Sequence, residues 1–163
     1  MKLEESLFPK ELRDKAVGSS REWGWKLEDI PQVIMECRKL EYGILGGQIQ
    51  FRIPGGTCEL YWRRADPKRK MPGENWADYS KRSCSEFIEL FGELVKKTDF
   101  EKEGLDWPFI KAKKESGVNI LDYLCFVLYP ISKSSYRRRR LNNLLSFTPG
   151  KVKRLAKIWF WKR

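Results

Sequence analysis

The stretch QIQFRIPGGTCELYW, residues 48–62, decides the fold. Its first half alternates apolar Ile49, Phe51 and Ile53 with polar residues, and its second half repeats the alternation from Cys58 to Trp62. A period of two is typical of strands with one buried face, and Pro-Gly-Gly at 54–56 supplies a tight turn between two such strands. The stretch therefore predicts a β-hairpin with strands at 44–53 and 57–64.

The two glycines just before this hairpin, at 46 and 47, need their own explanation. Glycine inside a strand pattern indicates a bulge, a bend or a close approach of another backbone or a ligand. We expect a bend at this position, with the other two as alternatives.

Two amphipathic helices are predicted around the hairpin. Over 29–42, Asp29 is a suitable N-cap, Pro31 fits the first turn, and Gly43 is expected to end the helix in a left-handed conformation. Over 75–97, Asn75 is the expected cap. One side of this second helix is apolar and is expected to pack across the hairpin; it carries Trp76, Tyr79, Cys84, Phe87, Ile88, Phe91, Leu94 and Val95.

The rest of the pattern completes an α+β fold. The apolar run at 124–129 fits a central strand buried on both faces, and a short helix is expected from Trp107-Pro108 to Lys114. We predict a small antiparallel sheet, built from the hairpin and a 123–129 strand, packed against the helices at 29–42 and 75–97. The expected domains are a charged lead-in over 1–20 that is either a short helix or a loose segment, one α+β domain over 21–130 whose core begins at Trp23, and an appended basic amphipathic tail over 131–163.

The formal charge of +11 is confined to that tail. Residues 131–163 contain eleven Lys and Arg and no acid, which leaves 22 basic residues and all 22 acidic residues in 1–130. The body is therefore electrically balanced, and the high isoelectric point of the whole chain does not describe its surface.

Composition excludes several classes of active site. The chain has no histidine, which removes Ser-His-Asp triads, Cys-His dyads and His-containing zinc sites. The four cysteines are too far apart in the sequence for zinc or thioredoxin motifs, so we expect them to be reduced and structural. No phosphate-binding glycine motif is present either. We therefore expect a protein that is not an enzyme and that uses no cofactor or metal.

The N-terminal residues and the length of the apolar stretches favour a cytoplasmic location. Two acids occur by position 5, without an apolar run of signal-peptide length, and the longest apolar run is far shorter than a membrane span.

Aromatic, Arg and Glu residues supply candidates for a protein-binding surface, because Tyr, Trp and Arg anchor many interfaces. Trp23 and Trp25 point the same way in an extended segment, where they form a binding ledge or cover the core. Tyr61 would lie on the outward face of the hairpin, which is either a contact surface or is covered by another part of the chain. Seven acids within 21 residues form a candidate acidic face, diluted by three lysines: Glu86, Glu89, Glu93, Asp99, Glu101, Glu103 and Asp106. The predicted partner-binding residues are Trp23, Trp25, Arg52, Tyr61, Arg64, Glu86, Glu89 and Glu93.

The basic tail leaves three alternatives open: binding of a nucleic-acid phosphate backbone, attachment to an anionic membrane surface, or a solvated extension without function. For the first, the candidate contacts are Arg137, Arg138, Arg139, Arg140, Lys151, Lys153, Arg154 and Lys157.

Several segments over about 21–130 together resemble the small immunity proteins of bacterial polymorphic-toxin systems. The segments are REWGWKLEDIP at 21–31, LGG at 45–47, GTCELYW at 56–62, WADY at 76–79, RSC at 82–84 and DYLCFVLY at 122–129. The resemblance implies a cytosolic, non-catalytic inhibitor that binds a cognate toxin domain and occludes it. The basic tail departs from this pattern.

Overall fold

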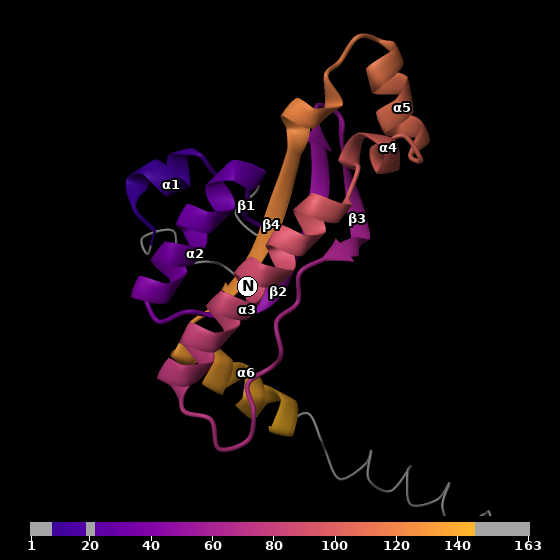
Figure 1. Cartoon of the computed structure of the whole chain (residues 1–163). Coiled ribbons are helices and arrows are strands. Elements are labelled where there is room, and N and C mark those ends of the chain that lie inside the picture. Colours follow the sequence, from indigo (N-terminus) through magenta and orange to yellow (C-terminus); the bar gives the residue numbers. More distant parts are fainter. Residues whose placement is uncertain (1–7, 19–21, 146–163) are drawn as a thin grey trace, which may run out of the picture. The chain divides into compact units, whose positions relative to one another are not determined.

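Four strands form one antiparallel sheet in the order β1-β4-β2-β3 (Figure 1). The computed structural model describes residues 8–18 and 22–145, and the chain divides into two compact units, residues 1–131 and 132–163. The first unit is α+β. Its strands are β1 (Gly24–Trp25), β2 (Gly43–Ile53), β3 (Gly56–Arg64) and β4 (Leu124–Ile131). Its helices are α1 (Lys10–Asp14), α2 (Ile30–Lys39), α3 (Trp76–Lys97), α4 (Phe100–Gly104) and α5 (Pro108–Glu115), with 3-10 turns at Leu27–Asp29 and Ile120–Tyr123; the second unit contains α6 (Lys133–Leu145).

Strand β4 lies inside the sheet, as its unbroken apolar run predicts. Phe126 pairs with Trp25 of β1 on one side and with Ile49 of β2 on the other. Seven of the eight β4 residues are buried. The hairpin of β2 and β3 is confirmed as well, with its turn at Pro54-Gly55.

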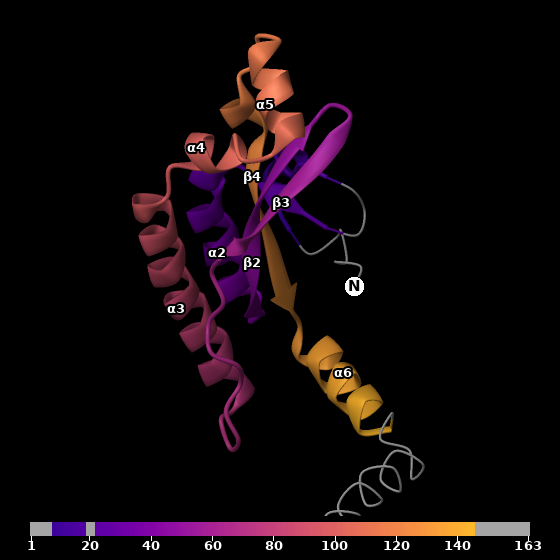
Figure 2. The same ribbon diagram turned by 90° about the vertical axis from the view of Figure 1, so that its right-hand side faces the viewer.

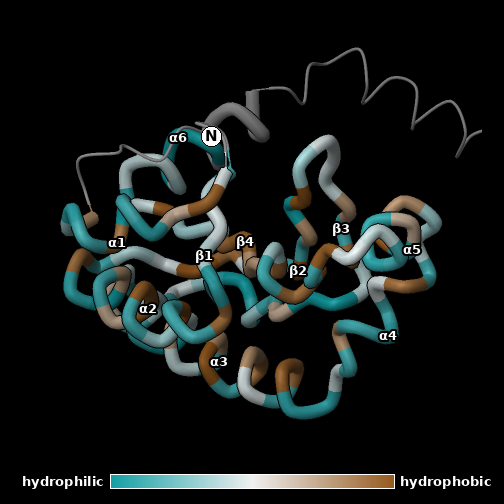
Figure 3. Tube along the Cα trace, turned by 90° about the horizontal axis from the view of Figure 1, so that it is seen from above, coloured by the Kyte–Doolittle hydropathy of each residue, from teal (hydrophilic) through white to brown (hydrophobic). Residues whose placement is uncertain are grey.

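Helices α2 and α3 cover one face of the sheet (Figure 2). Phe87 and Phe91 of α3 pack against Phe126 of β4, with ring centroids 5.5 and 5.2 Å apart. The hydropathy colouring places the apolar residues of β2 and β4 at the centre of the unit (Figure 3). Burial of these side chains between helix and sheet is the main stabilising contribution in a fold of this kind.

The start of α3 follows its predicted capping chemistry. The Asn75 side chain accepts a hydrogen bond from the Asp78 backbone N–H at 2.9 Å, which satisfies a donor that the first helical turn leaves free. The apolar side of α3 is narrower than expected, because Ile88 is 38% exposed.

The end of α2 differs from the prediction. The helix stops at Lys39, and Glu41 takes the left-handed conformation, with φ of 53°, that was expected of Gly43. Gly43 instead opens β2, where an added Cβ would lie 2.3 Å from the Tyr79 ring. Glycine is used here for the close approach of α3 and not for a turn.

The glycine pair at 46 and 47 combines two of its three possible roles. Strand β2 gains one residue relative to β4 between Ile44 and Gly47, which is a β-bulge, and Gly46 has φ of 140°. A Cβ on Gly47 would lie 2.1 Å from the Phe126 ring and 2.4 Å from the Val127 carbonyl oxygen. Bulge and close backbone approach therefore occur together.

The segment before Trp23 belongs to the core, which corrects the expected lead-in. Phe8 and Leu12 are 2% and 1% exposed, and the Trp25 indole N–H donates to the Leu12 carbonyl at 2.8 Å. Val17 forms an antiparallel bridge with Gly24. Residues 8–17 thus close one end of the unit and are not a loose extension.

Candidate functional site

Strand β3 is an edge strand with a bulge close to its end. Leu60 pairs with Ile49, but the next pair along β2 joins Gln48 to Arg64. The three β3 residues in between, 61–63, therefore have no partner in β2. Bulges at sheet edges redirect side chains, and this one changes which residues face solvent.

The bulge exposes two neighbouring aromatic residues. Tyr61 is 64% exposed and Trp62 is 43% exposed, with their rings in edge-on contact at a centroid distance of 4.9 Å. The sequence predicted Tyr61 on the surface but placed Trp62 on the buried side of the strand. That placement of Trp62 is wrong because the strand leaves its regular alternation after Leu60.

A carboxylate of α4 fixes the bulge. Glu103 accepts hydrogen bonds from the Arg63 Nε at 2.7 Å and from the Trp62 Nε1 at 3.0 Å, and it also pairs with the Arg63 Nη2. These bonds, with Arg63 contributing most, lower the pKa of Glu103. Held in this way, Trp62 loses little side-chain freedom on binding, which favours recognition.

We define the β3 surface as Glu59, Tyr61, Trp62 and Arg64, the exposed side chains of β3 from 59 onward. Arg64 is paired with Asp66 at 2.9 Å, both with side chains about half exposed. Glu59 accepts hydrogen bonds from the side chains of Gln48 and Gln50, at 3.1 and 3.3 Å. The β3 surface thus has an aromatic centre with one acidic and one basic flank.

The other predicted anchor on the hairpin, Arg52, is not free for a partner. Its side chain is 14% exposed, and its guanidinium donates to the Gln50 side chain at 3.0 Å and to the Glu22 carbonyl at 3.2 Å. It also donates to the Val17 carbonyl. The sheet face at this point is therefore covered by the chain's own N-terminal segment, the second of the two alternatives that the sequence left open.

The two N-terminal tryptophans differ in burial, but both belong to the core packing. Trp25 is fully buried, which corrects its assignment to a partner surface. Trp23 is half-buried and packs against the core, with its ring 6.0 Å from that of Trp25. The pair covers the core; it does not form a ledge.

The predicted acidic face is largely committed to contacts within the unit. Glu93 pairs with Lys97, Glu101 with Lys114 at 2.7 Å, and Glu103 with Arg63. Asp99 caps α4, accepting from the Lys102 N–H at 3.0 Å. Glu86 binds Arg82, whereas Glu89 is exposed. Charge that is already paired adds little attraction for a basic partner.

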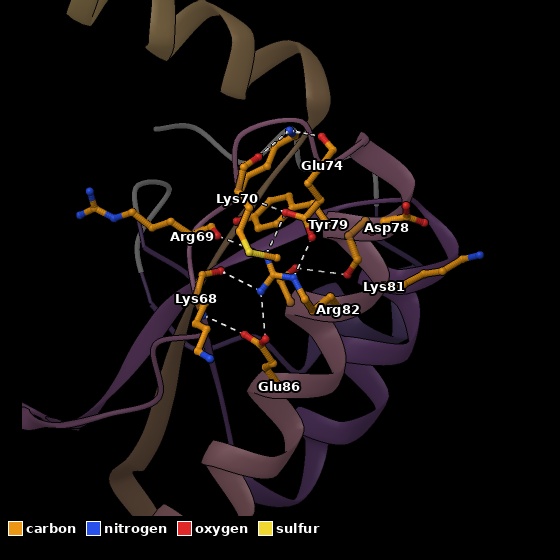
Figure 4. Close-up of polar contacts among 12 residues, drawn as sticks. Lys68, Arg69, Lys70, Glu74, Asp78, Tyr79, Lys81, Arg82 and Glu86 are labelled. Carbon is orange, nitrogen blue, oxygen red and sulfur yellow. Dashed lines mark hydrogen bonds and ion pairs between the residues drawn. The ribbon is translucent and has the colours of Figure 1, made fainter.

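Arg82 of α3 is the centre of a dense polar cluster (Figure 4). Its guanidinium donates five hydrogen bonds: two to Glu74, at 2.7 and 2.9 Å, one to Glu86 at 2.9 Å, and two to the carbonyls of Lys68 and Arg69, at 3.3 and 3.2 Å. Because a guanidinium has five N–H donors, all of them are used. The cluster fastens the 65–75 loop to α3, while the Arg69 side chain points away from it (Figure 4).

This cluster predicts acid-sensitive stability. The hydrogen bonds from Arg82 lower the pKa of Glu74 from its ordinary value of 4.5 to about 2. The unfolded chain therefore takes up the proton first, so the stabilisation is complete above about pH 4.5 and is lost as the pH falls towards 2. We expect the urea midpoint of unfolding to fall over this range, and to fall less in Glu74→Gln. Parallel pH profiles for the two proteins would contradict the assignment.

The four cysteines are buried and unpaired, as their apolar positions predict. Burial raises the pKa of the Cys84 and Cys125 thiols to about 11, and it also raises those of Cys37 and Cys58. Within residues 8–18 and 22–145, no group of three or more Cys, Asp or Glu side chains is placed to hold a metal ion, and no helix is long and apolar enough to cross a membrane.

No family model, curated protein or solved structure matches this chain.

The candidate residues of the tail are only partly within the described structure. Arg137, Arg138 and Arg139 lie on α6 with exposed side chains, and Arg140 lies on the same helix. The remaining four, Lys151, Lys153, Arg154 and Lys157, lie outside the described residues.

Proposed function

We propose that this protein is an immunity-type inhibitor, which binds a cognate bacterial toxin domain through the β3 surface and occludes it. The observation that carries the proposal is the exposure of Tyr61 and Trp62, 64% and 43%, on a bulge that Glu103 holds in place. The sequence resemblance to immunity proteins supplies the class of partner.

The physical argument rests on two properties of the bulge. Exposed neighbouring Tyr and Trp side chains are the residue types that contribute most at protein interfaces. Natural edge strands are normally protected from pairing by charge or bulges, and here the bulge also presents side chains that can be recognised specifically. The flanking Glu59, which accepts hydrogen bonds from the neutral side chains of Gln48 and Gln50, would set the orientation of the partner.

The test is co-expression of the full chain with candidate bacterial toxin domains, beginning with any encoded by a gene adjacent to that of this chain. The expected result is restored growth, together with recovery of a stoichiometric complex from the lysate by affinity purification of the toxin domain. Toxicity that persists while both proteins are expressed and folded, without a complex, would overturn the proposal.

A further inference from the structure

The positive charge of α6 has no counter-charge within its own unit. Residues 132–163 contain eleven basic residues and no acid. The side chains of Lys133, Arg137, Arg138 and Arg139 are exposed. By contrast, the arginines of the sheet and of α3 are matched with acids, as in the pairs of Arg63 with Glu103 and of Arg82 with Glu74.

The rest of the chain cannot neutralise this excess. The other 22 basic residues are balanced by 22 acids, so the net charge stays at +11 wherever the two units lie. Counter-charge must therefore come from another molecule, and a run of cations on one helix matches a polyanion better than single small anions.

The direction of the arginines indicates the shape of that polyanion. Successive residues of an α-helix are rotated by about 100°, so Arg137, Arg138 and Arg139 fan out over about 200° of the helix circumference. A flat membrane surface contacts one side of a helix, so it would reach only part of this fan of arginines. A nucleic-acid groove has phosphates along both of its walls and can reach charges on several sides of one helix.

We infer that α6 is a nucleic-acid-binding element that contacts the phosphate backbone through Lys133, Arg137, Arg138 and Arg139. The contacts are to phosphates, and guanidinium groups suit them because they form two parallel hydrogen bonds to phosphate oxygens. Binding of this kind is not specific for sequence. It is a second activity, separate from the β3 surface and from the proposed toxin inhibition.

The test is fluorescence anisotropy with the full chain and a labelled 20-base-pair DNA duplex over a salt series. Each neutralised phosphate contributes about −0.9 to the slope of log affinity against log salt, so the four cations predict a slope of about −4 or steeper. Replacing three arginines, in Arg137→Gln, Arg138→Gln and Arg139→Gln together, should reduce the steepness by about 3 and weaken binding at least about tenfold at low salt. Glutamine retains helix propensity, so α6 itself should persist.

A matched control variant removes three positive charges from helices of the first unit. Lys96, Lys102 and Lys111 are exposed on α3, α4 and α5, and their replacement by glutamine should leave the salt slope nearly unchanged. An equal loss in both triple variants, or no duplex binding at low salt, would overturn the inference. Binding to vesicles containing phosphatidylserine without binding to the duplex would overturn it in favour of a membrane surface. The arginine variant is also co-expressed with the toxin domain. If it still restores growth, the proposed inhibition holds whether or not α6 binds nucleic acid.

Discussion

Replacing Tyr61 and Trp62 together by alanine should weaken binding of the toxin domain by at least about 100-fold while the protein stays folded. Tyr61 is 64% exposed and Trp62 is 43% exposed, and neither belongs to the buried core, so their loss removes little from it. Central aromatic residues of an interface typically cost about 2 kcal/mol or more on truncation, which is roughly 30-fold in affinity for each, although such effects are not additive. Titration calorimetry of the complex, with a thermal-unfolding scan of the free variant, measures both quantities.

The matched control for this double variant lies on and just after α2. Met35 and Leu40 are 57% and 39% exposed, close to the values for Tyr61 and Trp62, and Met35→Ala with Leu40→Ala should leave affinity within about threefold because both lie outside the β3 surface. Since Trp62 also donates to Glu103, Tyr61→Ala alone provides a variant without that loss. Full affinity in both Tyr61→Ala and the double variant would assign binding to another surface.

The elements that the sequence predicted well are those set by local pattern. The alternation over 48–62 requires one apolar face, the continuous run at 124–129 requires burial on both faces, and Asn75 can cap only the helix that follows it. Each of these signals lies within a few residues of the structure it determines. The hairpin, β4 and α3 therefore have close to their predicted bounds.

The bulge of β3 could not be predicted from that pattern. Whether Trp62 continues the alternation depends on its register with β2, and that register changes between Gln48 and Ile49. Tyr61 and Trp62 are consecutive, and a regular strand would place them on opposite faces, so the local pattern gave no sign of the bulge. The sequence thus named two exposed residues of the β3 surface, Tyr61 and Arg64, and placed Trp62 on the wrong side of the strand.

Hydrogen bonds and ion pairs between residues far apart in the sequence could not be predicted from local patterns either. Glu103 lies 40 residues from Arg63, and Glu22 lies 30 residues from Arg52. Charged side chains in an isolated sequence are assigned to solvent by default, because a partner is visible only once the fold brings it near. For this reason the acidic run looked available for a partner, although most of it is paired within the unit.

Replacing Gly47 by alanine should be the most damaging single-methyl change in the sheet, and we expect a loss of about 3 kcal/mol or more in the free energy of unfolding. The new Cβ would lie 2.1 Å from the Phe126 ring and 2.4 Å from the Val127 carbonyl oxygen. The ring could rotate, but the carbonyl belongs to the backbone of the central strand. Gly47 also exchanges two hydrogen bonds of 3.1 Å with Ala65, so it cannot move away from β4 without breaking these two bonds.

The same substitution at Gly92 provides the control, because nothing lies within 4 Å of the Cβ that alanine would add there. Gly92 is inside α3, where alanine is favoured over glycine by about 1 kcal/mol, so Gly92→Ala should stabilise the protein. Urea denaturation of the three proteins compares the two effects directly. If Gly47→Ala unfolds at the wild-type midpoint, then β2 and β4 do not approach each other as closely as the bulge requires, and the packing of β4 at the centre of the sheet would have to be revised.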